Sequence, residues 1–220
     1  MRPAVDLRVY AVLDPTRCRD RSPAAMAAAA ARGGATLIQL RDKDTRTCRA
    51  IDTAREVLAA LAPFECPLLV NDRVDVALAI GAQGVHLGQD DMGPEDARRL
   101  LGPGAVIGAT VHHPPEADRL DAAIVDYAGI GPVFETGSKP DAEAPIGIDG
   151  LAALIVRTRQ GRPGFPCCGI AGVDHTNAAA VIAVGAAGVA VISDIFMADD
   201  VEAATRRLRR VVDRARGERP

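Results

Sequence analysis

The feature that most constrains the fold of this chain is a regular alternation of short apolar runs with helical stretches. Eight short apolar runs, most of them rich in Val, Ile and Leu, are typical of strands, and a segment with helical periodicity follows each of them. Strands separated by one short helix pair in parallel, because parallel neighbours need a crossover connection. The predicted strands are 9–13, 36–40, 68–71, 85–87, 106–110, 127–131, 166–169 and 188–192, and the predicted helices are 23–32, 45–61, 74–80, 94–101, 115–123, 149–159, 176–184 and 201–216.

Eight such units are typical of a TIM (β/α)8 barrel, which needs about 200–250 residues. We therefore predict an α/β fold with a single TIM-barrel domain over residues 1–220. A doubly wound sheet is the competing architecture. It is disfavoured because no glycine-rich dinucleotide-binding turn follows the first predicted strand, where the chain reads Leu13-Asp14-Pro15-Thr16.

The composition argues against several classes of partner. A net charge of −3 disfavours binding to nucleic acid through neutralisation of its phosphates. The sequence has no apolar run of about 18 residues, so no membrane span is expected. The five cysteines lack metal-ligand spacing, which favours reduced thiols and a cytoplasmic protein acting on small molecules. The oligomeric state stays open, and a homo-oligomer is compatible with the sequence.

Acidic residues follow two neighbouring predicted strands at the point where each strand ends. Asp72 follows strand 68–71, and Asp91 comes shortly after strand 85–87, with Asn71 and Gln89 beside them. Because the carboxyl ends of parallel neighbours lie at the same edge of a sheet, these side chains should converge. Two carboxylates without Cys or His ligands suit Mg²⁺, which takes oxygen ligands and usually shares them with a phosphate. We therefore predict a magnesium site at Asp72 and Asp91.

The lysines indicate a phosphate site at the same end. Of the 26 basic residues, only Lys43 and Lys139 are lysines and the others are arginines. The chain therefore uses arginine wherever any positive charge will serve. A retained lysine suggests a position that needs a compact ammonium acting on phosphate as a point charge. Both lysines come after predicted strands, and Arg41 lies close to Lys43. The alternative is that both are unconstrained surface residues.

A second anion site is expected where the last two predicted strands end. Ala171-Gly172 and Ile192-Ser193 form short turns of mostly small residues there. Backbone N–H groups of such turns, together with a helix N-terminus, form the usual monophosphate site of a barrel. A diphosphate site and a monophosphate site in one pocket suggest an enzyme that joins two phosphorylated small molecules and releases pyrophosphate.

Other residues have a simpler interpretation. His86 lies on a predicted buried strand and is expected to be a hydrogen-bonded core residue, whereas His112 lies nearer the substrates. Cys167 and Cys168 are expected to be buried as small apolar side chains.

Five segments of the chain stand out as motifs: Gln39-Leu40-Arg41-Asp42-Lys43, Asn71-Asp72-Arg73, Gly84-Val85-His86-Leu87-Gly88-Gln89-Asp90-Asp91, Gly131-Pro132-Val133-Phe134 and Thr136-Gly137-Ser138-Lys139. They resemble segments of the thiamine phosphate synthase family. The resemblance extends from about Tyr10 to Ala198, which is nearly the whole chain. It implies a TIM barrel that couples 4-amino-5-hydroxymethyl-2-methylpyrimidine diphosphate to a thiazole phosphate or carboxythiazole phosphate, giving thiamine monophosphate and pyrophosphate.

The resemblance also implies a role for each matched residue. Asp72 and Asp91 would hold Mg²⁺, while Arg41, Lys43 and Lys139 would be the catalytic cations. The aminopyrimidine can support a benzyl-like cation, so the leaving diphosphate needs charge neutralisation more than it needs a nucleophilic side chain. The pyrimidine diphosphate would be bound by Gln39, Leu40, Arg41, Asp42, Lys43, Asn71, Thr110 and Lys139, and the thiazole phosphate by Thr136, Gly137, Ser138, Ala171, Ile192 and Ser193.

The chain departs from the family pattern at four positions. Thr110 replaces the usual Ser and Ser138 the usual Thr, and both changes keep a hydroxyl. Glu135 replaces a Pro. Ala171 replaces a Gly, which keeps the backbone N–H but restricts φ. The thiazole phosphate turn therefore differs most from the family.

Two other functions stay open. A thiazole tautomerase on the same fold would aromatise the thiazole without joining it, and would not need the aspartate pair or the 39–43 segment. A non-catalytic barrel would serve as a regulator or binding module. Release of pyrophosphate that depends on Mg²⁺ and on both substrates distinguishes the synthase from these alternatives.

Overall fold

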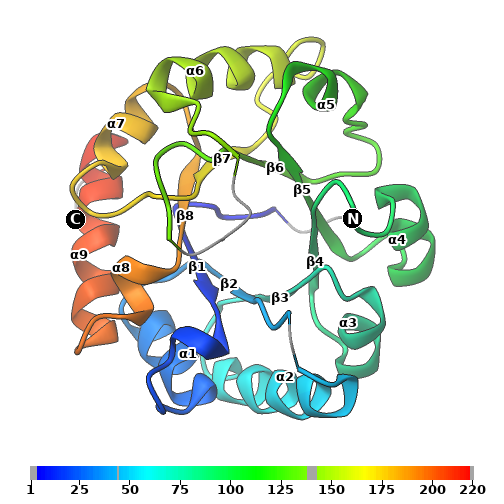
Figure 1. Cartoon of the computed structure of the whole chain (residues 1–220), viewed down its shortest axis with the longest axis vertical. Coiled ribbons are helices and arrows are strands. Elements are labelled where there is room, and N and C mark those ends of the chain that lie inside the picture. Colours follow the sequence, from blue (N-terminus) through cyan, green and yellow to red (C-terminus); the bar gives the residue numbers. More distant parts are fainter. Residues whose placement is uncertain (1–3, 44, 138–142, 219–220) are drawn as a thin grey trace.

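The centre of the molecule is a closed barrel of eight parallel strands, in which each strand pairs with the next and β8 pairs with β1 (Figure 1). This computed structural model describes residues 4–43, 45–137 and 143–218. Closure confirms the predicted barrel and excludes the doubly wound alternative, whose sheet is open. The strands are β1 (Val9–Leu13), β2 (Leu37–Leu40), β3 (Leu68–Asn71), β4 (Gly84–Leu87), β5 (Val106–Val111), β6 (Tyr127–Ile130), β7 (Cys167–Ile170) and β8 (Gly188–Val191).

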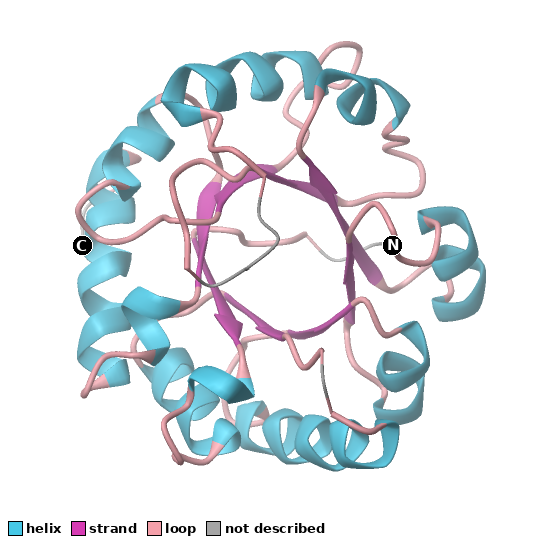
Figure 2. Cartoon of the chain, viewed as in Figure 1, coloured by secondary structure: helices cyan, strands magenta, loops and turns pink. Residues whose placement is uncertain are grey.

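Helices cover the outside of the barrel, as Figure 2 shows. The described residues form nine α-helices and one 3-10 helix, whereas eight helices were predicted. The two unpredicted segments, η1 (Pro15–Arg17) and α8 (Ser193–Phe196), are too short to give a periodic apolar pattern. The others are α1 (Pro23–Arg32), α2 (Thr47–Leu61), α3 (Val74–Ile80), α4 (Pro94–Leu101), α5 (Pro114–Arg119), α6 (Gly147–Thr158), α7 (Ala178–Ala183) and α9 (Val201–Ala215).

Some predicted boundaries are wrong by a few residues. Helix α5 ends four residues before the predicted position 123, because Leu120 adopts an extended backbone conformation. Strand β8 ends at Val191, so Ile192 belongs to the loop that leads into α8. This last difference matters for the site, because it places Ile192 in the connection that meets the cavity.

Successive side chains of each strand alternate between two cores. In β2, Ile38 and Leu40 pack in the outer core that the helices share, whereas Leu37 belongs to the core inside the barrel. The alternation follows from the two-residue period of a strand. It directs one polar side chain from each of several strands into the barrel interior: Gln39, Asn71, His86 and Thr110, all of them buried.

Two expectations from composition can be compared with the structure. All five cysteines lie in the described ranges and none forms a disulfide, although Cys48 is exposed rather than buried. In the part of the chain that the structure describes, no helix is long and apolar enough to cross a membrane.

Thr158 at the end of α6 is completely buried, and its hydroxyl has no hydrogen-bond partner among the described residues. Burying a hydroxyl without a partner is unfavourable. Thr158→Val keeps the shape of the side chain and is expected to raise the free energy of unfolding by about 1 kcal/mol, measured by urea denaturation.

The matched control is Thr205 on α9, which is equally buried but donates its hydroxyl hydrogen to the Val201 carbonyl at 2.7 Å. Thr205→Val should lower the free energy of unfolding by about 1 kcal/mol. A change of the same sign in both variants would contradict this account of Thr158.

Candidate active site

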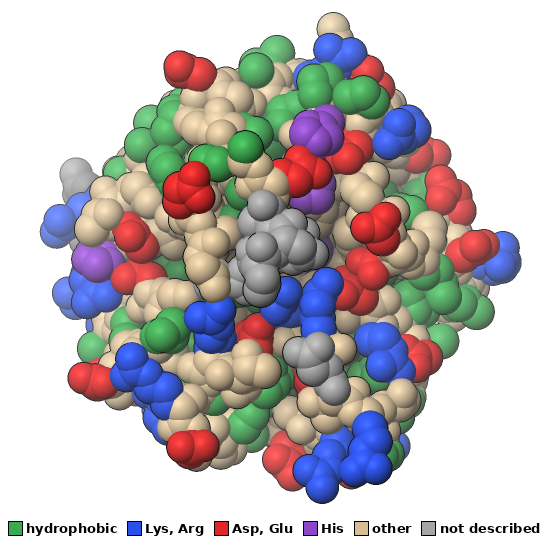
Figure 3. All heavy atoms as spheres, in the orientation of Figure 1, with side chains coloured by type: hydrophobic (Ala, Val, Ile, Leu, Met, Phe, Trp, Pro, Cys, Tyr) green, Lys and Arg blue, Asp and Glu red, His purple; other side chains and the backbone are tan. Residues whose placement is uncertain are grey.

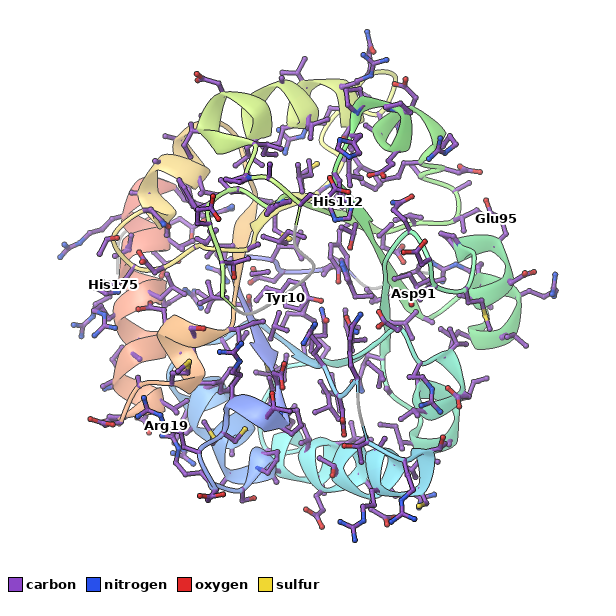
Figure 4. All side chains as sticks on the ribbon, in the orientation of Figure 1. Tyr10, Arg19, Asp91, Glu95, His112 and His175 are labelled. Atoms are coloured by element: carbon purple, nitrogen blue, oxygen red, sulfur yellow. The ribbon has the colours of Figure 1, made fainter. Side chains whose placement is uncertain are left out.

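A cavity of about 660 Å³ opens at the carboxyl ends of the strands. Figure 3 looks along the barrel and shows basic and acidic side chains meeting around the centre of this face. In Figure 4, Tyr10 lies near the centre of the barrel and Asp91 and His112 lie at its rim, whereas His175 lies at the periphery. This is the end at which barrel enzymes carry their active sites.

Most of the predicted site residues line this cavity. Leu40 and Asp42 do not, and Leu40 faces the outer core because it alternates with Gln39 along β2. Ser138 and Lys139 lie outside the described residues. The predicted residues that line the cavity are Gln39, Arg41, Lys43, Asn71, Asp72, Asp91, Thr110, Thr136, Gly137, Ala171, Ile192 and Ser193.

Asp72 and Asp91 converge as the strand order predicts. Asp72 follows β3 in a left-handed conformation with φ of 61°, and its N–H donates to the His86 carbonyl at 2.9 Å. One oxygen of Asp91 accepts from the Gly88 N–H at 2.7 Å. A non-glycine residue held at positive φ is often found at a functional site. Here the turn brings the Asp72 carboxyl into contact with that of Asp91.

The electrostatics of this pair favour the binding of a cation. Burial, and then the hydrogen bond and negative charge of Asp91, raise the pKa of the Asp72 carboxyl to about 6. Lys43 opposes the rise, since its Nζ lies 3.3 Å from Asp72 Oδ2. Two like charges this close favour protonation of one of them unless a cation is present.

The donor set fits a magnesium ion. Among the described residues there is no group of three or more His, Cys, Asp and Glu side chains that could hold a metal, so the pair can supply only part of a coordination shell. Mg²⁺ binds in this way, through one or two carboxylates together with water and substrate phosphate oxygens.

Arg41 is held in place by a carboxylate that sequence analysis did not assign to the site. Its guanidinium donates to Asp14 Oδ2 at 2.7 Å, and Asp14 Oδ1 accepts from the backbone N–H and hydroxyl of Thr16. Asp14 is buried and directly follows β1. Asp14 is an acidic residue directly after a strand, as Asp72 is. The same sequence signal could therefore have identified Asp14 as a site residue.

The polar side chains inside the barrel are hydrogen-bonded to one another. His86 Nδ1 lies 2.9 Å from the Tyr127 hydroxyl, and His86 Nε2 lies 2.9 Å from Thr110 Oγ1. The Tyr127 hydroxyl lies 2.8 Å from that of Tyr10, which accepts from the Gln39 amide. Burial lowers the pKa of His86 to about 4, so the imidazole is neutral at physiological pH. The expectation that His86 is a hydrogen-bonded core residue is confirmed.

The two turns of the predicted monophosphate site line the same cavity. After β7 the backbone is left-handed at both Ala171 and Gly172, with φ of 65° and 68°. A Cβ atom on Gly172 would lie 2.5 Å from the Glu135 carbonyl oxygen, so only glycine fits there. After β8, Ser193 begins helix α8.

Ala171 occupies a backbone conformation that disfavours any side chain with a Cβ atom. Ala171→Gly relieves this strain at the expense of a more flexible unfolded chain. The net expectation is a rise of about 0.5–1 kcal/mol in the free energy of unfolding, measured by urea denaturation.

The control is Ala178→Gly in helix α7, where glycine is disfavoured. This change should lower the free energy of unfolding. If Ala171→Gly is destabilising too, the positive φ at Ala171 does not strain the chain.

Three further contacts near the cavity were not anticipated. Arg17 of η1 lines the cavity and donates to the Gly137 carbonyl at 2.6 Å, joining the first loop to the sixth. Asp194 of α8, which also lines the cavity, accepts from His175 Nδ1 at 2.7 Å and lies 3.4 Å from Arg207 of α9. Each contact joins two different elements or loops, so no local sequence pattern could have indicated it.

The fold and this site together define a (β/α)8-barrel protein with a cavity at the carboxyl ends of its strands, into which several charged and polar side chains project. Residues 9–195 match the model of the family described as thiamine monophosphate synthase, and the chain belongs to that family. It is a transferase of thiamine biosynthesis.

Individual relatives agree with this assignment. A protein named thiamine-phosphate synthase from Agrobacterium fabrum is 46% identical over 211 residues, which cover 96% of each chain. Another of that name from Chloroflexus aurantiacus is 47% identical over 208 residues and 94% of each chain. The solved thiamine phosphate pyrophosphorylase from Pyrococcus furiosus has a TM-score of 0.83 and 34% identity, covering 96% of this chain and 98% of that one. A 3-hexulose-6-phosphate synthase structure, 16% identical with a TM-score of 0.64, shares the fold alone.

Proposed function

We propose that this chain couples 4-amino-5-hydroxymethyl-2-methylpyrimidine diphosphate to a thiazole phosphate and gives thiamine monophosphate and pyrophosphate. A thiazole phosphate that carries a carboxyl group also loses that group as CO2. The observation that carries the proposal is one cavity lined both by Asp72, Asp91 and Lys43 and by the turns that contain Gly172 and Ser193. A diphosphate needs the first set and a monophosphate suits the second.

The pyrimidine diphosphate is assigned to the side of the cavity formed by β2 to β5. Gln39, Asn71 and Thr110 offer buried polar groups to the ring. Arg41 and Lys43 are the cations for the diphosphate, and Lys139 joins them in this proposal from outside the described residues. Asp14 keeps the Arg41 guanidinium oriented, which limits the freedom that the side chain loses when substrate binds.

Asp72 and Asp91 would hold Mg²⁺, which when bound supplies charge that offsets the negative charge of the diphosphate. The bond between the pyrimidine methylene carbon and the diphosphate oxygen breaks, and its electron pair leaves with pyrophosphate. Arg41 and Lys43 stabilise that developing charge by position alone, without a proton transfer. The thiazole nitrogen then donates its lone pair to the methylene carbon and forms the new carbon–nitrogen bond.

The thiazole phosphate is assigned to the opposite loops. Backbone N–H groups after β7 and β8 would hold its phosphate, with Thr136, Gly137 and Ser138 beside it. The left-handed backbone at Ala171 supports this assignment, because that residue keeps the turn although the family usually has glycine there.

The test uses the purified protein with both substrates and Mg²⁺. Formation of thiamine monophosphate with an equal amount of pyrophosphate is the expected result. A change in the thiazole without release of pyrophosphate would mean a tautomerase, and no reaction together with substrate binding would mean a binding module. Either outcome overturns the proposal.

We also propose a cytoplasmic location, since five cysteines that form no disulfide suit a reducing compartment. The oligomeric state stays open, and light scattering of the purified protein would determine it.

A further inference from the structure

Five buried side chains form one unbroken hydrogen-bonded chain across the inside of the barrel. The order is Gln39 (β2), Tyr10 (β1), Tyr127 (β6), His86 (β4) and Thr110 (β5). The three links after the first measure 2.8, 2.9 and 2.9 Å. Tyr10, Gln39, His86 and Thr110 line the cavity, whereas Tyr127 is fully buried and is not among its lining residues. The chain therefore joins two cavity residues on different strands through a residue that a ligand in the cavity does not touch.

Counting the hydrogen atoms shows in which direction the groups of this hydrogen-bonded row donate. Each hydroxyl carries one hydrogen, and so does a neutral imidazole. The Gln39 amide nitrogen donates to the Tyr10 oxygen. If Tyr10 then donates to Tyr127, and Tyr127 donates to Nδ1 of His86, the imidazole must carry its own hydrogen on Nε2 and donate it to Thr110. Every hydrogen between Gln39 and Thr110 is then used.

The opposite direction leaves a group unsatisfied. Tyr10 would then accept from both Gln39 and Tyr127, and its own hydrogen would have no acceptor among the described residues. Leaving a buried donor without an acceptor is unfavourable. The opposite direction becomes favourable only if the Gln39 amide also turns over, so that its oxygen faces Tyr10 and its nitrogen faces the cavity.

We propose that these five side chains form a one-way hydrogen-bond relay. The relay determines which cavity residue offers a hydrogen-bond donor to the ligand and which offers an acceptor. Thr110 accepts from His86 and offers its own hydroxyl hydrogen to the ligand, while Gln39 offers its carbonyl oxygen. His86 and Tyr127 are positioning residues for this arrangement.

The placement of the Thr110 donor and the Gln39 acceptor favours one class of ligand. The cavity takes a ring with an acceptor atom on the β5 side and a donor, such as an exocyclic amino group, on the β2 side. An aminopyrimidine fits, whereas the corresponding oxo-pyrimidine places a carbonyl where Gln39 also presents a carbonyl. Naming the aminopyrimidine rests on the proposed function, but the direction of the relay does not.

The first measurement is the tautomer of His86 in the wild-type protein without ligand, read from the ¹⁵N chemical shifts of its ring nitrogens. The expected result is a protonated Nε2 and an unprotonated Nδ1. A protonated Nδ1 would overturn the relay. This measurement needs neither a variant nor activity, so it stays decisive even if no thiamine monophosphate forms.

The second measurement compares the dissociation constants of the 4-amino and 4-oxo pyrimidine diphosphates by calorimetry, with Mg²⁺ and without the thiazole phosphate. The wild-type protein is expected to prefer the 4-amino compound by about tenfold or more, because the 4-oxo compound leaves buried polar groups mispaired. In Tyr127→Phe the relay is cut, the Gln39 amide can turn over freely, and the preference should fall to about threefold or less.

Thr205→Val is the matched control, since it removes a buried hydroxyl from α9 and leaves the barrel interior intact. It should keep the wild-type preference. An unchanged preference in Tyr127→Phe would overturn the relay without affecting the proposed function. Failure of both compounds to bind, with the Nε2-protonated tautomer present, would overturn the proposed function and leave the relay standing.

Discussion

Replacing Asp72 or Asp91 by asparagine is expected to abolish magnesium-dependent turnover while the barrel stays folded. Both carboxylates follow adjacent parallel strands and line the cavity, and neither belongs to an apolar core. Loss of the metal's stabilisation of the diphosphate should raise the activation free energy by several kcal/mol. Pyrophosphate release measured against Mg²⁺ concentration tests this result. A kcat near that of the wild type in either variant would remove the metal assignment.

Although Asp72→Asn should abolish turnover, it should stabilise the metal-free protein against unfolding. Because folding raises the pKa of this carboxyl from its ordinary value of 3.8 to about 6, the folded protein binds the proton more tightly than the unfolded chain does. The metal-free protein therefore loses stability as the pH rises from about 4 to about 6, and the loss is complete above that range. At pH 8 without metal, Asp72→Asn is expected to raise the free energy of unfolding by about 1 kcal/mol.

A neighbouring carboxylate provides the control. Asp75 of α3 is exposed and pairs with Arg73, which lowers its pKa. Asp75→Asn should leave turnover unchanged and should not stabilise the protein at pH 8. If Asp72→Asn destabilises the metal-free protein, then burial and the charge of Asp91 do not dominate the environment of Asp72.

Replacing Lys43 or Lys139 by arginine is expected to lower kcat by about tenfold or more, which corresponds to about 1.4 kcal/mol. The Lys43 ammonium lies 3.3 Å from Asp72 Oδ2, so it sits beside the proposed metal site. An ammonium is a compact point charge that can follow the departing diphosphate, whereas guanidinium is larger, planar and prefers a fixed bidentate geometry. Steady-state kinetics with both substrates at saturation measures the effect.

The control for the lysines must lie away from the cavity. Arg214 is an exposed residue of α9, and Arg214→Lys should leave kcat unchanged. Arg207 on the same helix is unsuitable, because its guanidinium lies 3.4 Å from Asp194, which lines the cavity. Full activity in both Lys→Arg variants would leave the diphosphate site with Arg41 and Mg²⁺ alone.

Local pattern was enough to predict the barrel and most of the candidate site residues that line its cavity. Strand β3 and strand β4 were recognisable from their apolar runs, and the acids after them from position alone. Parallel pairing then brings the segments that carry Asp72 and Asp91 to the same end of the sheet. The lysine at position 43 was found in the same way, because it follows β2 closely.

Other features depend on contacts that no local pattern encodes. Leu40 stands between two residues that line the cavity, yet it faces the helices, because the strand continues its alternation to that point. The carboxylate of Asp14 meets Arg41 only because β1 and β2 pair in a particular register.

The sequence by itself determined the fold class and the acids and cations at the ends of the strands, because both follow from the two-residue period of a strand and from parallel pairing. Only the closed barrel decided that the side chains inside it form a connected chain. Tyr10 and Tyr127 are 117 residues apart and come from strands that are not neighbours, yet their hydroxyls lie 2.8 Å apart. Closure of the barrel turns both side chains to one interior, where they are buried and each polar group needs a hydrogen-bond partner.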